Sequence, residues 1–406
     1  MMVITVGPGK DYSSMNGALQ YLTSISPLSE ATDIIVQGDT TEGAISGSWA
    51  INLGGYTLRI YSDSPHGGDP TAGHVLNISA SNRAALKMQS QGTGLLEVYG
   101  LRFRGSGSNG SIQGLDLSSN GPDIKCHDCI IDFSGMTGTS LRPLYISAPS
   151  ATPDYDFWNI AIACPSTASV PAAIQAYNSY AAAMVLEDIS VQGGNYGLNL
   201  AGAPMDVRNC VAFGAALGAF FNVGGANGYN NASDDGSSDD VNWSTGVGNV
   251  VTPIVPASAF YSLSTSDSEW LKVRPGGVLE NAGTTVTITE NVLGIRVNDR
   301  PHGTDFSIGA DEGFGHQRPG QQAKQLQLNT SSFVQNLDVN VKTVQQLAEA
   351  TDQLRVLAPP ELSIPDVTET GTDQDGDARM AINEILSVLR AQGLIDEESS
   401  SSSSSP

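Results

Sequence analysis

Leu96-Glu97-Val98-Tyr99-Gly100-Leu101-Arg102-Phe103 is the first of five eight-residue segments that follow one pattern. The first, third, sixth and eighth residues of each segment are apolar, and the fifth is Gly, Asn or Asp. The other four segments are Ile124–Ile131, Tyr155–Ile162, Met184–Val191 and Met205–Ala212. The fifth residues of the five segments are, in order, Gly100, Asp128, Asn159, Asp188 and Asn209.

The pattern predicts a strand, a bend and a second strand in every segment. Alternation with a period of two indicates a β-strand with one buried side, and the change of phase at the fifth residue indicates a bend that keeps the same side buried. Gly, Asn and Asp accept the left-handed backbone that such a bend needs. Successive bends lie 28, 31, 29 and 21 residues apart, which is typical of a solenoid. We therefore expect an all-β parallel β-helix, with a β-sandwich as the alternative.

The composition agrees with a turn-rich β protein. The 406 residues include 45 Gly, only 15% are charged, and the formal net charge is −23. Such a charge makes nucleic acid and anionic membranes poor partners. The sequence has no apolar run of membrane-spanning length, and Met1–Lys10 lacks the layout of a signal peptide. We therefore expect synthesis in a cytoplasm without export by the usual route.

The chain divides by pattern into an N-terminal part, a long repeat region and a helical C-terminal part. Residues 1–30 hold a short strand and a helix over Tyr12–Leu22, which Ser13 or Ser14 caps and which closes the open end of the first coil. The later boundaries are 31–315 for the β-helix, 316–332 for a linker, 333–358 for a coiled-coil-like helix, 359–376 for an acidic linker, 377–395 for a C-terminal helix and 396–406 for a Ser-rich disordered tail.

Five further stretches carry a resemblance to known proteins. They are Val6–Ser14, Ser268–Gly277, Asn281–Gly283, Asp299–Pro301 and Ser307–Glu312. The first is similar to the opening, and the others to the closing coils, of a large family of right-handed β-helix proteins. This resemblance covers about residues 3–315 and implies a right-handed parallel β-helix. Members include secreted sugar-binding or sugar-cleaving proteins and phage spike or fibre proteins. The resemblance is therefore more specific for the fold than for an activity.

The two C-terminal helices predict self-association. Apolar residues recur at heptad spacing in the first helix and along one stripe of the second, and neither helix is long enough to be stable alone. The second also resembles short C-terminal helices of phage virion proteins, which implies a homotrimer and attachment to the particle. Packing against the chain's own β-helix is the alternative. The candidate oligomerisation residues are Leu337, Val344, Leu347, Leu354, Ile382, Ile385 and Leu389.

Candidate site residues fall into an acidic loop and an outward stripe. Paired carboxylates can divide acid and base roles in polysaccharide cleavage, but Asp in a Gly/Ser/Asn-rich loop is more typical of a solvated turn. The candidates are Asp234, Asp235, Asp239 and Asp240, near Trp243. The fourth residues of the five segments form the stripe: Tyr99, His127, Trp158, Glu187 and Arg208. Tyr99, Trp158 and Trp243 are the candidates for stacking on a sugar.

The cysteines predict no metal or redox site. Cys126 and Cys129 form a C-x-x-C motif, but both occupy apolar positions of the pattern, as does Cys210. They are therefore expected in the core, and a zinc site would need a second ligand pair that the sequence does not space for it. We expect neither metal nor cofactor.

Together these features predict a non-enzymatic bacteriophage virion protein. We expect a trimeric β-helix on the particle, either as capsid decoration or head fibre, or as a tail fibre or spike for host adhesion. Its expected partners are further copies of itself, major capsid or tail proteins, and a host surface glycan. A polysaccharide-degrading lyase or hydrolase, or a carbohydrate-binding module, are the alternatives.

Overall fold

The computed structural model describes 1–288 with gaps, together with 307–310. The gaps are 43–48, 67–68, 79–83, 107–110, 138–139, 149–152, 167–170, 179–182, 203–204 and 240–242. The chain forms two compact units, Met1–Leu328 and Asn329–Pro406. The linkers, both C-terminal helices with their seven oligomerisation residues, and the Ser-rich tail expected over 316–406 all lie outside the described residues.

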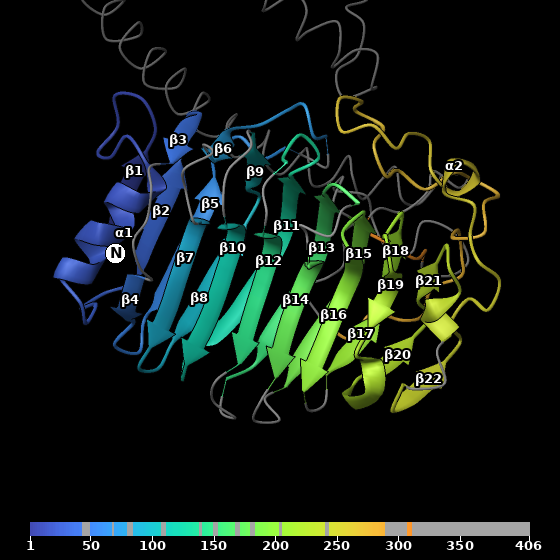
Figure 1. The fold of residues 1–406 in the computed structure, drawn as a ribbon. Helices are drawn as coiled ribbons and strands as arrows, with labels where there is room; N and C mark the ends of the chain where they lie inside the picture. The colour runs from blue at the N-terminus through green and yellow to red at the C-terminus, as the bar shows by residue number, and fades with distance from the viewer. Residues whose placement is uncertain are drawn as a thin grey trace, which may run out of the picture. The chain divides into compact units, whose positions relative to one another are not determined.

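The described chain is mostly β and forms two parallel sheets (Figure 1). The fifteen-stranded sheet contains β1 (Met2–Val6), β2 (Thr32–Val36), β3 (Thr40–Glu42), β5 (Thr57–Ser62), β6 (Val75–Ile78), β8 (Leu95–Tyr99), β9 (Arg102–Gly105), β11 (Asp123–Asp132), β13 (Tyr155–Ala163), β15 (Met184–Gln192), β17 (Asp206–Arg208), β18 (Val211–Phe213), β20 (Asn227–Tyr229), β21 (Ala232–Ser233) and β22 (Thr245–Val247). The seven-stranded sheet contains β4 (Trp49–Asn52), β7 (Ala84–Gln91), β10 (Ser111–Asn120), β12 (Ser140–Ala148), β14 (Ala172–Asn178), β16 (Tyr196–Gly202) and β19 (Gly218–Phe221).

Helices are few and short in the described chain. They are α1 (Met15–Ser24), α2 (Pro256–Ala259) and the 3₁₀ turns η1 (Val223–Gly225) and η2 (Ser237–Asp239). Among them, none combines the length and apolar character that a membrane span requires. The mostly β composition predicted from the sequence is therefore confirmed.

From β10 to β16 the chain alternates between the two sheets, so each circuit adds one strand to each. Strand β11 pairs in parallel with β13, and β13 with β15, while β10 pairs with β12, and β12 with β14. Within a sheet, each strand therefore lies beside the strand from the next circuit (Figure 1).

The five bends form the predicted column. Backbone φ is 64° at Gly100 and 51°, 52°, 54° and 50° at Asp128, Asn159, Asp188 and Asn209. The residues on either side are paired in register: His127 lies opposite Trp158, and Cys129 opposite Ile160. The same pairing continues through the next two strands and past the last predicted bend, because Asn230 (φ 51°) and Gly248 (φ 68°) follow in the column.

One apolar core runs between the two sheets. The residues at the first, third, sixth and eighth positions of all five segments belong to it, and none is more than 2% exposed. Cys126, Cys129 and Cys210 occupy such positions, and all four cysteines of the chain are buried and unpaired. The placement of the cysteines in the core is therefore confirmed.

Helix α1 lies at the end of the sheets formed by the first strands (Figure 1). It begins at Met15 rather than at Tyr12, and the Ser14 hydroxyl accepts a hydrogen bond from Gly17 N at 3.2 Å. The residues predicted to share one face are fully buried: Met15, Ala18, Leu19 and Leu22. The apolar face of this helix therefore joins the core.

A buried carboxylate caps the same helix. Glu42 accepts hydrogen bonds from Met15 N at 2.9 Å, Asn16 N at 3.1 Å and the Thr40 hydroxyl at 2.7 Å. Its side chain is fully buried, and this burial raises its pKa despite the three donors. The first amide groups of α1, which have no partner inside the helix, are therefore satisfied from β3.

A second core covers the outer side of the fifteen-stranded sheet. The seventh residues of the segments, which point away from the first core, include Ile130, Ala161 and Val211. They pack against later residues that include Phe260, Trp270, Leu271, Val273 and Ile308. Strands that follow the bends are thus buried on both faces, as their continuous apolar runs allow.

The segment that resembles closing coils contributes to this cover. Strand β22 is the last strand of the described chain, and Ser268–Gly277 adds no strand to either sheet. Instead, Phe260 and Val273 form an isolated antiparallel bridge, and Trp270 is 1% exposed in the second core.

Two replacements of Asn159 test the left-handed bend. Both Asn159→Gly and Asn159→Ala remove the side chain, but only alanine is strained at φ 52°. We expect alanine to lower the free energy of unfolding by about 1 kcal/mol more than glycine, after allowing for glycine's greater unfolded-state entropy. Urea unfolding of the two variants measures this difference. Equal stability would contradict a conformational requirement at the bend.

Candidate functional site

The predicted outward stripe is a continuous ladder across the fifteen-stranded sheet. The rings of Tyr61, Tyr99, His127 and Trp158 stack with centroid distances of 5.0, 5.1 and 4.2 Å and interplanar angles of 7°, 2° and 7°. Neighbouring parallel strands lie about 4.8 Å apart, so in-register rings meet at stacking distance. Tyr61, from β5, extends the ladder before the first predicted residue.

The ladder continues beyond the rings with charged residues. Glu187 lies opposite Trp158, Arg208 opposite Glu187, and Tyr229 opposite Arg208. The Arg208 guanidinium lies 3.9 Å from the centre of the Tyr229 ring, a cation–π contact. The structure therefore brings together all five predicted stripe residues in the predicted order.

A row of alternating charge runs beside the ladder. In-register pairing places Asp33, Arg59, Glu97, Lys125 and Asp156 on successive strands. Arg59 Nε donates to Glu97 Oε2 at 3.0 Å, and its Nη1 lies 3.7 Å from Asp33 Oδ1. Opposite charges on adjacent strands stabilise this register, because a shift that paired like charges would be repulsive.

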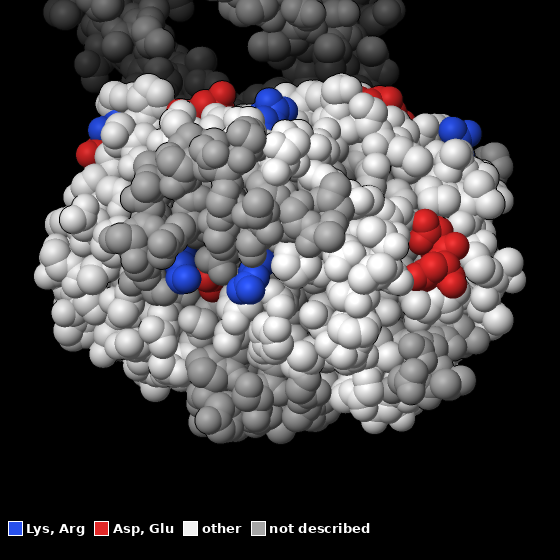
Figure 2. All heavy atoms as spheres, in the orientation of Figure 1, with Lys and Arg blue, Asp and Glu red and all other residues white. Residues whose placement is uncertain are grey.

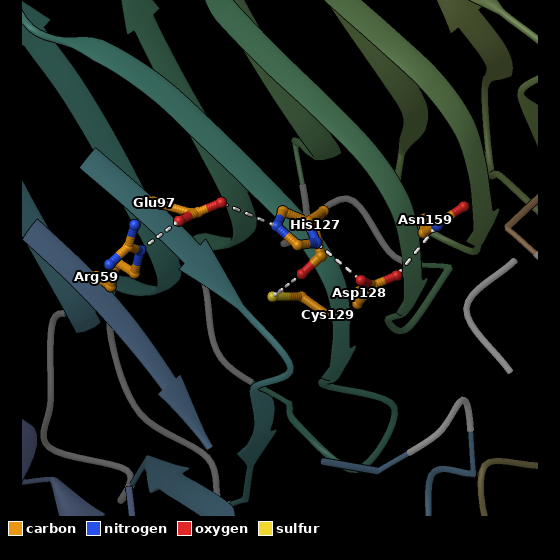
Figure 3. A network of polar contacts seen from close by, with 6 residues as sticks. All are labelled: Arg59, Glu97, His127, Asp128, Cys129 and Asn159. Atoms are coloured by element: carbon orange, nitrogen blue, oxygen red, sulfur yellow. Dashed lines mark hydrogen bonds and ion pairs between the residues drawn. The ribbon is translucent and has the colours of Figure 1, made fainter. Parts of the chain in front are cut away.

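His127 links the two rows to the column of bends (Figure 3). Its Nδ1 lies 2.7 Å from Asp128 Oδ2, and its Nε2 lies 3.7 Å from Glu97 Oε1. Asn159 Nδ2 then donates to Asp128 Oδ1 at 3.0 Å, which joins one bend to the next. The polar contacts therefore cross several strands.

Two carboxylates keep His127 charged. Burial opposes protonation of the imidazole, but the hydrogen bond with Asp128 and the contact with Glu97 outweigh it and raise its pKa to about 9. In return, His127 lowers the pKa of Glu97, with Arg59 acting in the same direction and burial opposing them. The group is a partly exposed ion network that links neighbouring strands.

The later part of the ladder is covered by the chain itself. The Glu187 carboxylate is fully buried and accepts hydrogen bonds from Thr287 N at 2.7 Å and the Thr287 hydroxyl at 2.8 Å. Asn209 exchanges two side-chain hydrogen bonds with the Thr284 backbone, at 2.7 and 2.9 Å. Asn230 Nδ2 donates to Ala282 O at 2.9 Å. Residues 282–287 therefore lie along the bends.

Neither candidate tryptophan presents a face to solvent. Trp158 is 3% exposed, between the rungs of His127 and Glu187. Trp243 is 6% exposed, packs edge-on against Phe220, and donates from Nε1 to Ser238 O at 3.1 Å. The proposed sugar stacking on these two rings conflicts with their burial, whereas Tyr99 is only partly buried and stays a candidate.

The described carboxylates of the acidic loop bind backbone amides of the preceding circuit. Asp234 Oδ2 accepts from Gly214 N at 2.8 Å, and Asp235 Oδ2 accepts from Ala219 N at 2.7 Å. Burial raises the pKa of Asp234. Burial acts in the same direction on Asp235, but hydrogen bonds, chiefly from Ser237, lower its pKa overall.

The other two carboxylates predicted in the acidic loop lie outside the described side chains. Asp239 ends η2, but its side chain lies outside the described residues, as does all of Asp240. In the described part of the chain, no cluster of three or more His, Cys, Asp or Glu side chains is arranged to hold a metal ion.

A hollow of about 570 Å³ lies between the fifteen-stranded sheet and the turn at 262–265. Its described lining includes Ser134, Cys164, Gln192 and Ser264. Burial raises the pKa of the Cys164 thiol well above its ordinary value, so the thiolate is disfavoured. This hollow therefore lacks an activated nucleophile or a paired acid and base among its described residues.

The outer side of the seven-stranded sheet carries aromatic residues that the five-segment pattern does not include. Tyr145, Tyr177, Tyr196 and Phe221 gather there, from β12, β14, β16 and β19. The available signal is the alternation in β14, where Ile174 and Ala176 are core residues and Gln175 and Tyr177 lie between and after them. These strands carry no Gly, Asn or Asp bend of the kind that marks the five segments, so the shared pattern did not include them.

The charge on His127 predicts a pH-dependent stability. The folded state raises the pKa of His127 from 6.5 to about 9. Its contribution is therefore complete below pH 6.5, declines as the pH rises towards 9, and is lost above that. The full contribution is on the order of 3 kcal/mol as an upper bound. Urea unfolding between pH 6 and pH 9.5 measures the decline.

His127→Gln removes this contribution and should flatten that part of the stability profile. Asp128→Asn retains a residue that tolerates the bend but removes the nearer carboxylate, so it should reduce the decline without abolishing it. If His127→Gln has the same decline as the wild-type chain, the charged network does not stabilise the fold.

No family model matches this sequence, and neither the curated proteins nor the solved structures compared with it gave a match. The chain's own residues therefore carry the assignment of its function.

Proposed function

We propose that this chain is a non-catalytic structural protein of a tailed-phage particle. In this proposal the two parallel sheets are faces of one right-handed parallel β-helix, which projects from the head as a decoration protein or fibre, or from the tail as a fibre or spike. The C-terminal helical segments trimerise the chain and attach it to a capsid or tail protein. The particle setting rests on the resemblance of the C-terminal helix to those of phage virion proteins, and of the opening and closing sequences to a β-helix family that includes phage spike and fibre proteins.

One observation carries the structural part of the proposal. The side chains best suited by type to binding or catalysis act as cross-links between circuits. They are the ring ladder, the His127 network and the amide-bound Asp234 and Asp235. Each joins strands or loops that are distant in sequence. A body with such repeated links is stiff along its length, which suits a projection from a particle.

The mass of the full-length chain tests the trimer. Light scattering after size exclusion should give three times the 42.3 kDa of one chain. Leu347→Asp places a charge in the predicted heptad seam and should reduce the trimer, whereas Gln345→Asp lies outside the seam and should not. A monomer at micromolar concentration, with both variants unchanged, would refute the trimer.

The particle itself tests the location. Electron microscopy of particles labelled with an antibody against this chain should show the label on the head surface or on the tail. The absence of label from intact particles, with the protein found only in the cell lysate, would refute the virion role.

A polysaccharide-cleaving spike is the second candidate, and one observation favours it. The adjacent carboxylates Asp234 and Asp235 have pKa values shifted in opposite directions, and the carboxylates of a general acid and a general base also differ in this way. Release of reducing ends from host capsule by the wild-type chain, lost in both Asp234→Asn and Asp235→Asn, would support cleavage. Retained folding of both variants must be shown by circular dichroism, because these carboxylates also bind backbone amides.

A further inference from the structure

A row of polar and aromatic side chains crosses the seven-stranded sheet from one circuit to the next. In-register pairing aligns Lys87, Asp116, Tyr145, Gln175, Asn199 and Phe221, which we name the outer row. Successive members lie on adjacent strands, so the row advances by about 4.8 Å per residue. This periodic arrangement offers repeated contacts to a linear, repeating ligand.

Gln175 holds an unpaired polar atom within this row. Its side chain is 5% exposed, and its Nε2 donates to the Tyr177 hydroxyl at 2.5 Å, but its Oε1 has no hydrogen-bond partner. If the amide is turned over, its nitrogen is unpaired instead, so one polar atom lacks a partner in either orientation. An unpaired buried polar atom is unfavourable, and a ligand hydroxyl can act as donor or acceptor towards it.

Aromatic rings lie on both sides of this amide. Tyr145 is opposite Gln175 on β12, Tyr177 follows two residues later on β14, and their ring centres are 5.9 Å apart. Further along the sheet, Tyr196 stacks on Phe221 at 4.0 Å, and Phe221 is 38% exposed. Such rings can contact the apolar faces of sugar rings, and the tyrosine hydroxyls can bind polar groups.

The face has little net charge, although the chain carries a net charge of −23. Lys87 Nζ lies 3.2 Å from Asp116 Oδ2, so these two charges compensate each other. The Arg142 guanidinium lies 5.4 Å from the centre of the Tyr145 ring and adds one further positive charge. Figure 2, drawn in the orientation that shows the seven-stranded sheet in Figure 1, has few Lys, Arg, Asp or Glu side chains among the described residues of this side. Such a surface complements a neutral ligand better than a strongly charged one.

We infer that the outer side of the seven-stranded sheet binds a neutral polysaccharide along the outer row. The Gln175 amide and the Asn199 amide bind sugar hydroxyls, and Tyr145, Tyr177 and Phe221 contact sugar rings. This inference deepens the adhesive part of the proposed function and rests on it. It also moves the binding surface from the covered ladder at Trp158 to the opposite sheet.

Affinity electrophoresis of the full-length chain in gels with dextran, yeast mannan or arabinoxylan tests the inference. At least one of these neutral polysaccharides should retard the wild-type chain. Tyr177→Ala should weaken that binding at least tenfold. Tyr56→Ala is the matched control, because Tyr56 is 41% exposed in the turn before β5 and should not affect binding.

Gln175→Leu separates binding from a structural role. Because the substitution removes an unpaired amide atom, it should weaken binding while leaving the urea midpoint unchanged or higher. A lower midpoint with unchanged binding would mean that Gln175 serves the fold alone, and would overturn the inference.

Two other results would overturn it. The first is that none of the three polysaccharides retards the wild-type chain, a result that leaves the virion and trimer proposals intact. The second is that Tyr177→Ala changes the oligomeric state, which would make this face a contact between copies. Conversely, loss of the trimer in Leu347→Asp with retained retardation would support the binding surface independently of the trimer.

Discussion

The left-handed bend, repeated at one place in successive circuits from Gly100 to Gly248, is the constraint on which the rest of the structure depends. A residue with φ near 50° turns the strand without exchanging its buried and exposed sides, so the apolar core continues through the corner. Because parallel strands pair in register, the bend of one circuit lies beside the bend of the next. Asn and Asp at these positions also supply side chains that connect neighbouring bends, as Asn159 and Asp128 do.

The in-register pairing explains why like residues form rows. A ring placed at one position meets the residue at the same position of the next circuit, and the strand spacing is close to a stacking distance. For charges, the same geometry favours alternation, and the row from Asp33 through Arg59 to Glu97 alternates accordingly. The ladder and the ion network are therefore consequences of the register as well as supports for it.

The inner core and its bends were predictable because a local residue pattern specifies both. The alternation of apolar residues, its change of phase and the bend residue can all be seen within eight consecutive positions, as in Tyr155–Ile162. The cap on α1 was not predictable in this way, because Glu42 lies 27 residues from Met15 and no local pattern connects them. The second core was not predicted, although the apolar seventh residues Ile130 and Val211 were an available signal.

The order of the ladder residues was predictable from the sequence, but their exposure to solvent was not. Alternation placed Trp158 on the outer side of its strand, and the structure has it there in the ladder. Part of what covers the outer side comes from 100 residues later in the chain, as the contact between Glu187 and Thr287 illustrates. Period-two patterns distinguish the two sides of a sheet, but they do not determine which later segment packs against either side.

The segment along the bends has a consequence for how the described sheets unfold. In a simple stack of repeats each unit contacts only its neighbours, so an end unit can open alone. Here Ala282, Thr284 and Thr287 bind Asn230, Asn209 and Glu187 on three successive circuits. Opening the last of these circuits therefore also disturbs the strap that binds the two before it. We therefore expect these three circuits to unfold as one cooperative block, with less fraying from that end than in a simple stack.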